Sequence, residues 1–195
     1  MEFITDFVSN LSSLSESSKN KFLKLMTLNS YEKGHVIAEL GEVPTNFFVI
    51  KSGIARSYIT NDKGKEFIRN FFVPVSSTGS FSALVLEKPS RLTYDCLTDC
   101  EVYSGNFKAF KKLARENIDI SNMYAVVLER IFMRMEKRIF ELSVLDATKR
   151  YLNLKKEIPD IDNLIPQYHI ASYLNITPVQ LSRIRKGLYS KKEKP

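Results

Sequence analysis

The sequence has no tryptophan, only two cysteines and only two histidines among its 195 residues. Two cysteines cannot build a disulfide framework, and two histidines are too few for a histidine-rich metal centre. Apolar runs end after about five residues, whereas a membrane-spanning helix needs roughly twenty. Residues 1–6 lack the basic and apolar regions that open a secretory signal. These absences favour a reducing, cytoplasmic setting with no membrane segment, no metal and no cofactor.

The composition predicts a folded chain, because 44% of the residues are hydrophobic and 13 phenylalanines and 9 tyrosines can fill a core. The net charge of +7 is unevenly spread. Residues 1–145 hold 19 basic and 17 acidic residues, whereas residues 146–195 hold 10 and 5. A basic C-terminal part is typical of a nucleic-acid-binding surface. For residues 191–194 alone, a solvated tail is the simpler explanation.

Glycine marks the first half of the chain, where six of the seven glycines lie within residues 1–105. Turn residues at this spacing, between short β-branched and aromatic runs, predict a β-sandwich or barrel. A hairpin turn is expected at residues 61–64, and two helices are expected before the strands, at residues 3–11 and about 17–27. The expected strands are residues 35–37, 47–50, 54–59, 66–72, 94–97 and 101–103.

The hydrophobic pattern changes its period at about residue 118, where a stretch without glycine or proline runs to residue 145. A helix of this length measures about 42 Å, longer than the β domain needs, so we expect it to pair with a second copy of itself. The alternative is that the helix only packs on its own β domain. Tyr124, Val127 and Ile131 are additional apolar positions that could hold the helix to the barrel. The 3-4-3-4-3 spacing typical of a coiled-coil seam joins Ala125, Leu128, Phe132, Met135, Ile139 and Leu142.

Beyond a short helix expected over residues 147–158, residues 167–186 fit a helix-turn-helix. Ala171 is small enough for close helix packing, and Asn175 tolerates the left-handed backbone of the turn. Thr177 suits the N-cap of the second helix, residues 177–187. Short helical hairpins without a DNA-binding role share such patterns, so that alternative stays open. The expected inward side chains are Ile170, Leu174, Ile176, Leu181 and Ile184.

The outer face of the second helix carries side chains that suit a DNA major groove. Arginine can pair with guanine and glutamine with adenine, while lysines and the helix N-terminus can contact phosphates. The predicted DNA-binding residues are Thr177, Val179, Gln180, Ser182, Arg183, Lys186, Lys191 and Lys192.

The order of these parts resembles the Crp-Fnr superfamily of bacterial transcription regulators. The residues that carry the resemblance are Lys33-Gly34, Leu40-Gly41-Glu42, residues 48–58, Gly64-Lys65-Glu66, residues 170–174 and residues 181–186. The resemblance implies an α+β fold in three parts. These are an N-terminal double-stranded β-helix (jelly-roll) domain at residues 1–117, a dimerisation helix at 118–145, and a helix-turn-helix domain lacking a full wing at 146–195.

In function, the resemblance implies a cytoplasmic homodimer that binds near-palindromic double-stranded DNA and is not an enzyme. Arg183 matches the recognition-helix arginine of the family. By the family pattern the β-roll is an effector-binding domain, and the sequence gives neither the identity nor the existence of a small-molecule effector.

The cyclic-nucleotide cassette departs from the family pattern, which has a glutamate for the ribose and an arginine for the cyclic phosphate. Aligned on residues 99–102, Ser80 replaces the glutamate, Ser90 stands at the arginine position, and Arg91 lies one residue late. Losing an arginine–phosphate pair removes a strong contact, so we expect cAMP and cGMP not to bind well. An effector pocket would lie at Gly79, Ser80, Ser90 and Arg91, beside Phe71 or Tyr94. The alternative is a pocket filled by Phe71, Phe72 or Phe81.

Two other classes of function remain as alternatives. A β-roll sensor or interaction module would bind protein rather than DNA. A metal-dependent enzyme would need about three converging ligands, and the β region holds only one histidine, His35. Cys96 and Cys100 cannot supply an iron–sulfur cluster and are expected to be buried strand residues. His35 and His169 are expected to be structural or surface groups.

Overall fold

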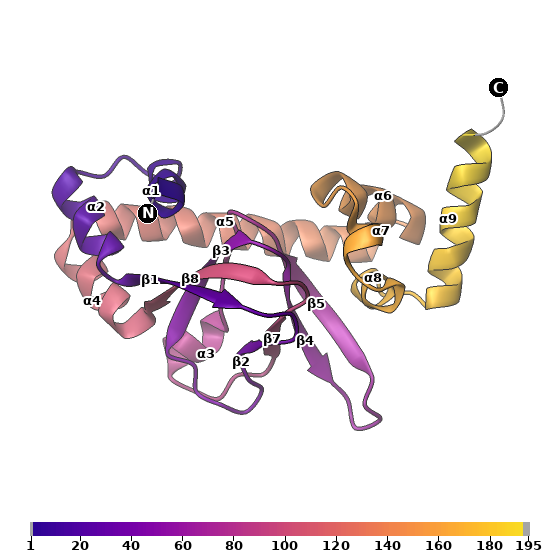
Figure 1. Ribbon diagram of the computed structural model, residues 1–195, viewed down its shortest axis with the longest axis horizontal. Helices are drawn as coiled ribbons and strands as arrows, with labels where there is room; N and C mark the ends of the chain where they lie inside the picture. Colours follow the sequence, from indigo (N-terminus) through magenta and orange to yellow (C-terminus); the bar gives the residue numbers. More distant parts are fainter. Residues whose placement is uncertain (1, 193–195) are drawn as a thin grey trace.

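The molecule is a β-roll with a group of helices at each end (Figure 1). One long helix, α5 (Ile118–Val144), runs beside the roll and connects the two groups. The structure, a computed structural model, describes residues 2–192 and the side chains of residues 2–188. Helices α1, α2 and α4 gather at one end of the roll, and α6 to α9 gather at the other (Figure 1). No helix among the described residues has both the length and the apolar character needed to cross a bilayer.

The roll is built from two four-stranded antiparallel sheets, which confirms the predicted jelly-roll architecture. One sheet has the strand order β1-β8-β3-β6 and the other β2-β7-β4-β5. The strands are β1 (Met26–Tyr31), β2 (Val36–Ala38), β3 (Asn46–Ser52), β4 (Ala55–Thr60), β5 (Glu66–Phe72), β6 (Ser77–Thr78), β7 (Thr93–Cys96) and β8 (Cys100–Asn106).

Several helices begin where a side chain can accept a hydrogen bond from a free backbone N–H. Asn106, Asn117 and Asp146 cap α4, α5 and α6 in this way. The helices are α1 (Glu2–Ser9), α2 (Glu16–Leu23), α3 (Phe81–Leu86), α4 (Phe107–Glu116), α5 (Ile118–Val144), α6 (Ala147–Glu157), α7 (Ile161–Leu164), α8 (Gln167–Tyr173) and α9 (Pro178–Lys192).

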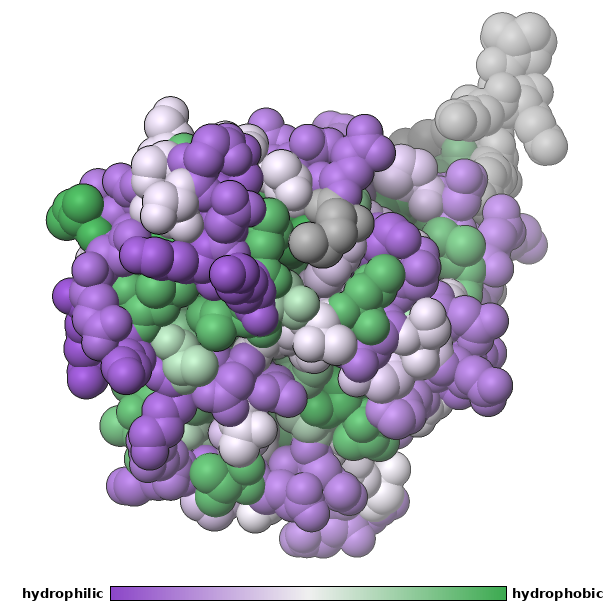
Figure 2. All heavy atoms as spheres, turned by 60° about the vertical axis from the view of Figure 1, so that its left-hand side comes forward, coloured by the Kyte–Doolittle hydropathy of each residue, from purple (hydrophilic) through white to green (hydrophobic). Residues whose placement is uncertain are grey.

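The buried side chains form three clusters. One fills the space between α1, α2, α4, α5 and the first sheet, and a second lies within the roll. The third joins Ile54 and Leu97 of the roll to Tyr151, Leu174 and Leu181 of the C-terminal helices. The C-terminal helices therefore share a core with the roll. On the side where α1, α2 and α4 lie, hydrophobic residues also reach the surface in several groups between hydrophilic ones (Figure 2).

The six expected strands, the hairpin at residues 61–64 and the long helix are confirmed. The expected helix at residues 17–27 is wrong at its end, because α2 stops at Leu23 and residues 26–31 form β1. That segment pairs with β8 along the edge of a sheet, and this long-range pairing overrides its local helical pattern. Strand β6 and helices α3, α4 and α7 are also additions to the prediction.

Gly53 occupies a turn that no other residue fits. Its φ is +85°, and a Cβ there would lie 2.2 Å from the carbonyl oxygen of Asp99. Gly64 is a matched control, because its φ is +74° but a Cβ would meet nothing within 4 Å.

We therefore expect Gly64→Ala to lower the free energy of unfolding by about 1 kcal/mol, the cost of the left-handed backbone alone. Gly53→Ala adds a backbone clash and should cost about 3 kcal/mol. Urea unfolding of both variants measures the difference. Equal losses would contradict the close approach at Gly53.

Candidate functional site

Helices α8 and α9 form the predicted helix-turn-helix. Asn175 adopts the left-handed backbone at the turn, with φ at 55°, as its tolerance of that conformation predicts. Ala171, Leu174 and Leu181 are completely buried between the helices and their neighbours. Ile176 packs partly buried against the same cluster. The local sequence requirements for a tight helical corner are therefore met together.

Thr177 and Gln180 form a capping box at the start of α9. The backbone N–H of Gln180 donates to Thr177 Oγ1 at 3.2 Å, and the backbone N–H of Thr177 donates to Gln180 Oε1 at 2.8 Å. Thr177 is thus the N-cap, as predicted, and α9 proper begins at Pro178. The Gln180 side chain is exposed but tied to the cap, so it must leave Thr177 before both its amide groups can contact adenine.

The outer face of α9 is exposed, as a reading helix requires. Val179 is 60% exposed, and Ser182, Arg183 and Lys186 are exposed with it. Arg185, on the opposite side, forms an ion pair with Asp162 at 3.7 Å. The helix does not stop at residue 187 but continues to Lys192. The side chains of Lys191 and Lys192 lie outside the described residues.

The α5 seam is exposed in its second half. Phe132 is 67% exposed and Ile139 63% exposed, and Met135 and Leu142 are also open to solvent. Leu128, nearer the start of the helix, is half-buried. In contrast, Tyr124, Val127 and Ile131 face the roll, where Tyr124 and Val127 pack against its core. Helix α5 therefore has one face on its own domain and one apolar face without a partner in the described chain.

A cavity of about 560 Å³ lies between the roll, α3, α4 and α5, within the range of about 300–1,000 Å³ typical of small-molecule sites. Of the four predicted effector residues, Gly79, Ser80 and Arg91 line it. Ser90 does not line it. Its hydroxyl lies behind the wall, 2.8 Å from the hydroxyl of Ser80.

The aromatic residues around the cavity do not fill it. Tyr94, Phe72 and Phe81 line its wall, so the alternative of a closed pocket is wrong for this structure. Phe71 does not line this cavity. It packs instead against the C-terminal helices, with its ring 4.8 Å from that of Tyr173. Successive strand residues point to opposite faces of a sheet. Phe72 therefore faces the cavity, whereas Phe71 faces the C-terminal helices.

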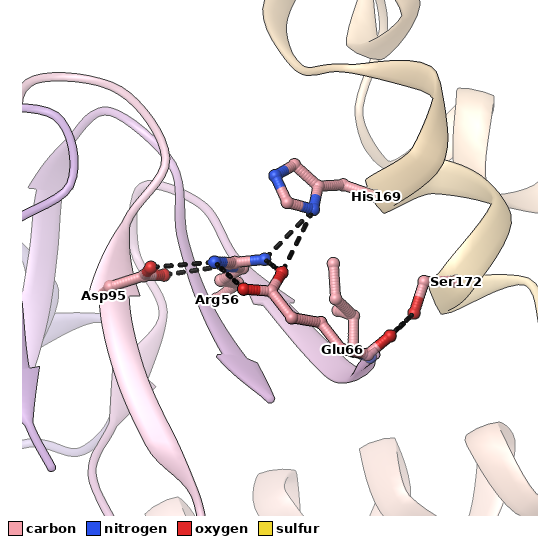
Figure 3. Close-up of polar contacts among 6 residues, drawn as sticks. Arg56, Glu66, Asp95, His169 and Ser172 are labelled. Atoms are coloured by element: carbon pink, nitrogen blue, oxygen red, sulfur yellow. Dashed lines mark hydrogen bonds and ion pairs between the residues drawn. The ribbon is translucent and has the colours of Figure 1, made fainter. Parts of the chain in front are cut away.

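A buried polar cluster joins the roll to α8 (Figure 3). Arg56 on β4 donates to both carboxylate oxygens of Asp95 on β7, from Nε at 2.8 Å and from Nη2 at 2.9 Å. Its Nη1 donates to Glu66 on β5 and lies 3.0 Å from Nδ1 of His169 on α8. The Arg56 side chain is only 6% exposed. One guanidinium group therefore connects three strands and the helix-turn-helix.

His169 is neutral in this cluster. Arginine can only donate hydrogen bonds, so Nδ1 of His169 must accept and the ring proton lies on Nε2. Burial, and next the charge of Arg56, lower the pKa of His169 to about 4, and Lys33 adds to the shift. Glu66 and Asp95 oppose it. Of the two roles expected for His169, structural or surface, the structure confirms the structural one and places the ring in a buried position between α8 and the roll.

Ser172, one turn after His169, bonds the edge of the second sheet. Its hydroxyl donates to the carbonyl oxygen of Glu66 at 2.9 Å and accepts from the backbone N–H of Ile68 at 3.0 Å. Strand β5 is the last strand of its sheet, so these backbone groups have no neighbouring strand. Helix α8 therefore covers part of an open sheet edge.

The two cysteines and His35 take part in no metal site within the described residues. Cys96 and Cys100 are free and buried in the roll, as expected. His35 stacks on Tyr31 with ring centroids 4.2 Å apart. In the part of the chain that the structure describes, no three His, Cys, Asp or Glu side chains come together as a metal site.

Comparison with known proteins agrees with this architecture. Residues 28–117 match the family described as the cyclic nucleotide-binding domain. A search of the curated proteins returns no match.

Solved structures with this fold include several regulators. FixK2 from Bradyrhizobium japonicum superposes with a TM-score of 0.72 at 20% identity, over 86% of each chain. A protein from Eubacterium rectale, described as a transcriptional regulator of the Crp/Fnr family, gives 0.70 at 17% identity, over 91% of this chain and 85% of that one. The c-di-GMP-responsive regulator CLP of Xanthomonas campestris gives 0.69 at 13% identity, over 91% and 93%.

These findings confirm the resemblance to Crp-Fnr proteins at the level of the fold. The segment 28–117 matches the model of the cyclic nucleotide-binding domain, and most of the chain shares the fold of these solved structures. The lining departs from the cyclic-nucleotide pattern, and weak binding of cAMP and cGMP stays a prediction. No carboxylate among the described residues lines it to hold ribose hydroxyls, and the hydroxyl of Ser80 bonds that of Ser90.

The contact between the roll and α8 was not predicted from the sequence. One signal was available, because Arg56 lies in a run of alternating strand residues, and a charge inside a roll requires partners. Nothing in the sequence pairs it with His169, which is 113 residues away. Arg69 and Arg134, which line the cavity with Arg91, were also not identified.

The neutral His169 predicts an acid-sensitive stability. The unfolded chain takes up the proton near pH 6.5, the ordinary value for histidine, whereas the folded chain takes it up only near pH 4. The unfolded state therefore binds more protons between these values, and stability falls as the pH falls from about 6.5 to about 4.

We expect this linkage to remove on the order of 2 kcal/mol from the wild type, after discounting for solvent screening. In His169→Gln, which keeps an acceptor for Arg56, that component should be absent. Urea unfolding at pH 7, 6, 5 and 4.5 measures it, with His35→Gln as the control for loss of a histidine. Identical pH slopes for the wild type and His169→Gln would contradict the assignment.

Proposed function

We propose that this chain is a homodimeric, DNA-binding transcription regulator of bacteria. The observation that carries the proposal is the exposed outer face of α9, held by a left-handed Asn175 turn on the fold of Crp/Fnr regulators. Two such helices related by two-fold symmetry would enter successive major grooves about 34 Å apart.

Dimer formation is supported by the apolar face of α5. Phe132, Ile139 and Leu142 are exposed at heptad spacing and belong to no core cluster. Met135, also exposed, lies where α5 borders the cavity. Leaving such a stripe in water is unfavourable, at about 25 cal/mol for each Å² of apolar surface. A second copy of α5 offers the same stripe and would cover it through knobs-into-holes packing.

DNA contact is supported by the chemistry of the α9 face. Arg183 is exposed and can pair with guanine, and Gln180 can pair with adenine once it leaves the cap. Lys186, Lys191 and Lys192 would contact phosphates, and Thr177 and Val179 would approach the backbone and a thymine methyl at the helix start. These roles follow from side-chain chemistry and position.

Two structural connections would couple the cavity to the DNA-binding helices. Helix α5 lines the cavity with one face and carries the dimer seam on another. The cluster of Arg56, Glu66, Asp95 and His169 fixes α8 to the roll. An effector in the cavity would bias the position of α5 and hence the spacing of the two α9 helices.

Replacing Arg183 and replacing Lys186 should affect DNA binding in different ways. Selection from a random duplex library first identifies the operator, and fluorescence anisotropy then measures binding. Arg183→Ala should lose about 1–3 kcal/mol of discrimination at one base pair in each half-site. Lys186→Ala should weaken binding to all duplexes equally and reduce the salt slope by about 1.

The control for these DNA measurements is Arg115→Ala, which changes an exposed arginine at the end of α4. If no duplex is bound, or if Arg183→Ala and Lys186→Ala behave alike, the role assignment is wrong. Salt-insensitive binding to a protein instead would favour an interaction module.

The seam predicts the oligomeric state. Phe132→Glu and Ile139→Glu should convert the dimer to monomers, because each places two carboxylates in an apolar contact. Sedimentation velocity measures the change, and Val85→Glu, at an exposed apolar residue on α3, is the control. Dimers that survive both seam substitutions would contradict α5 pairing.

A further inference from the structure

The cavity beside α5 has a wall of mixed character. Most of its lining is apolar and comes from both sheets, α4 and α5, for example from Phe47, Phe72, Phe107, Tyr124 and Ile131. A ligand that fills this space must offer an apolar body of comparable size, because burying apolar surface is the main favourable contribution available there.

The charged groups of the lining all have one sign. Three arginines, Arg69 of β5, Arg91 before β7 and Arg134 of α5, line the cavity, and no Asp, Glu, Lys or His among the described residues does. All three side chains are exposed, so they lie where the cavity meets solvent. The cavity therefore combines an apolar interior with a positively charged opening.

These three arginines differ from the other interior-facing arginines. Arg56 is paired with Asp95 and Glu66, Arg138 donates to the carbonyl oxygen of Tyr173, and Arg150 donates to that of Leu174. In the described part of the chain, no ion pair or hydrogen bond is formed by Arg69, Arg91 or Arg134. Burial lowers the pKa of Arg134, and the charge of Glu157 partly offsets that effect. Three guanidinium groups from three separate elements thus surround one space, and none of them is held in an ion pair.

A further polar atom at the cavity lacks a partner. Thr78 lines the cavity, and its hydroxyl oxygen is buried without a hydrogen bond in the described structure. Buried hydroxyl groups without partners are rare in folded proteins and cost stability. A ligand with a polar group near β6 would supply the missing hydrogen bond.

We propose that this cavity binds a small organic anion with an apolar body, of the aromatic or aliphatic carboxylate class, and not a cyclic nucleotide. The apolar walls take the body and the arginines take the carboxylate through charge-assisted hydrogen bonds. The missing carboxylate in the lining removes the contact that a ribose needs. Because Tyr124, Ile131 and Arg134 belong to α5, such a ligand touches the seam helix directly.

This inference rests on the proposed role of the roll as an effector domain, so its test uses ligand binding without DNA. The probes are two shape-matched pairs that differ in charge: 1-naphthylacetate with neutral 1-naphthylacetamide, and decanoate with neutral decanamide. The chain has no tryptophan, so naphthyl fluorescence reports binding directly. Calorimetry measures the aliphatic pair and cAMP with the full chain.

At least one acid should bind about tenfold more tightly than its amide, and more tightly than cAMP. Arg91→Gln and Arg134→Gln should each abolish most of that preference while leaving amide binding unchanged, which also shows that the variants are folded. Arg115→Gln, an exposed arginine outside the cavity, should keep the preference.

The proposal is overturned if neither acid binds, if each acid and its amide bind equally, if the arginine variants keep the preference, or if cAMP binds more tightly than either acid. Anisotropy with the operator duplex, measured without any ligand, tests DNA binding separately. A chain that binds DNA but no acid refutes only this inference, and a chain that binds acid but no DNA refutes only the proposed function.

Discussion

The orientation of the C-terminal helices depends on one buried guanidinium group. Arg56 lies in the roll with its charge balanced by the bidentate contact to Asp95 and by Glu66, and its remaining donor meets Nδ1 of His169. An arginine this deeply buried requires partners in fixed positions, because removing any one leaves a charge without water. The partners come from two parts of the chain. Displacing α8 would therefore disturb the interior of the roll as well as the boundary.

Hydrophobic periodicity and turn chemistry predicted most of the fold, because those signals are local. The glycine spacing marked the strands, the 3-4 spacing marked α5, and Ala171, Asn175 and Thr177 marked the helical corner. Strand β1 was not predicted, since residues 26–31 become a strand only by pairing with β8, about 75 residues away. Strand β6 has only two residues and carries no periodicity of its own.

The same rule applies to the candidate sites: residues on one local element could be predicted, and residues brought together from distant elements could not. The exposed face of α9, through Lys186, could be predicted residue by residue because one helix supplies all of it, and its contact with DNA stays a prediction. The cavity was located only approximately, through Gly79, Ser80 and Arg91, and Ser90 proved to support the wall from behind. Arg69 and Arg134 lie on elements distant in sequence, and only the folded chain brings them to one space. No local sequence pattern indicates that residues so far apart in the chain line the same cavity.

The contact of Ser172 with β5 has a consequence for the solubility of the protein. While α8 is docked, its hydroxyl occupies the backbone groups of Glu66 and Ile68 on an outer strand. A chain whose C-terminal helices swing outward would present that strand bare, as a template on which a strand from another molecule can add. The docking contact thus also guards against aggregation, and loosening it would make the chain prone to self-association through β-augmentation.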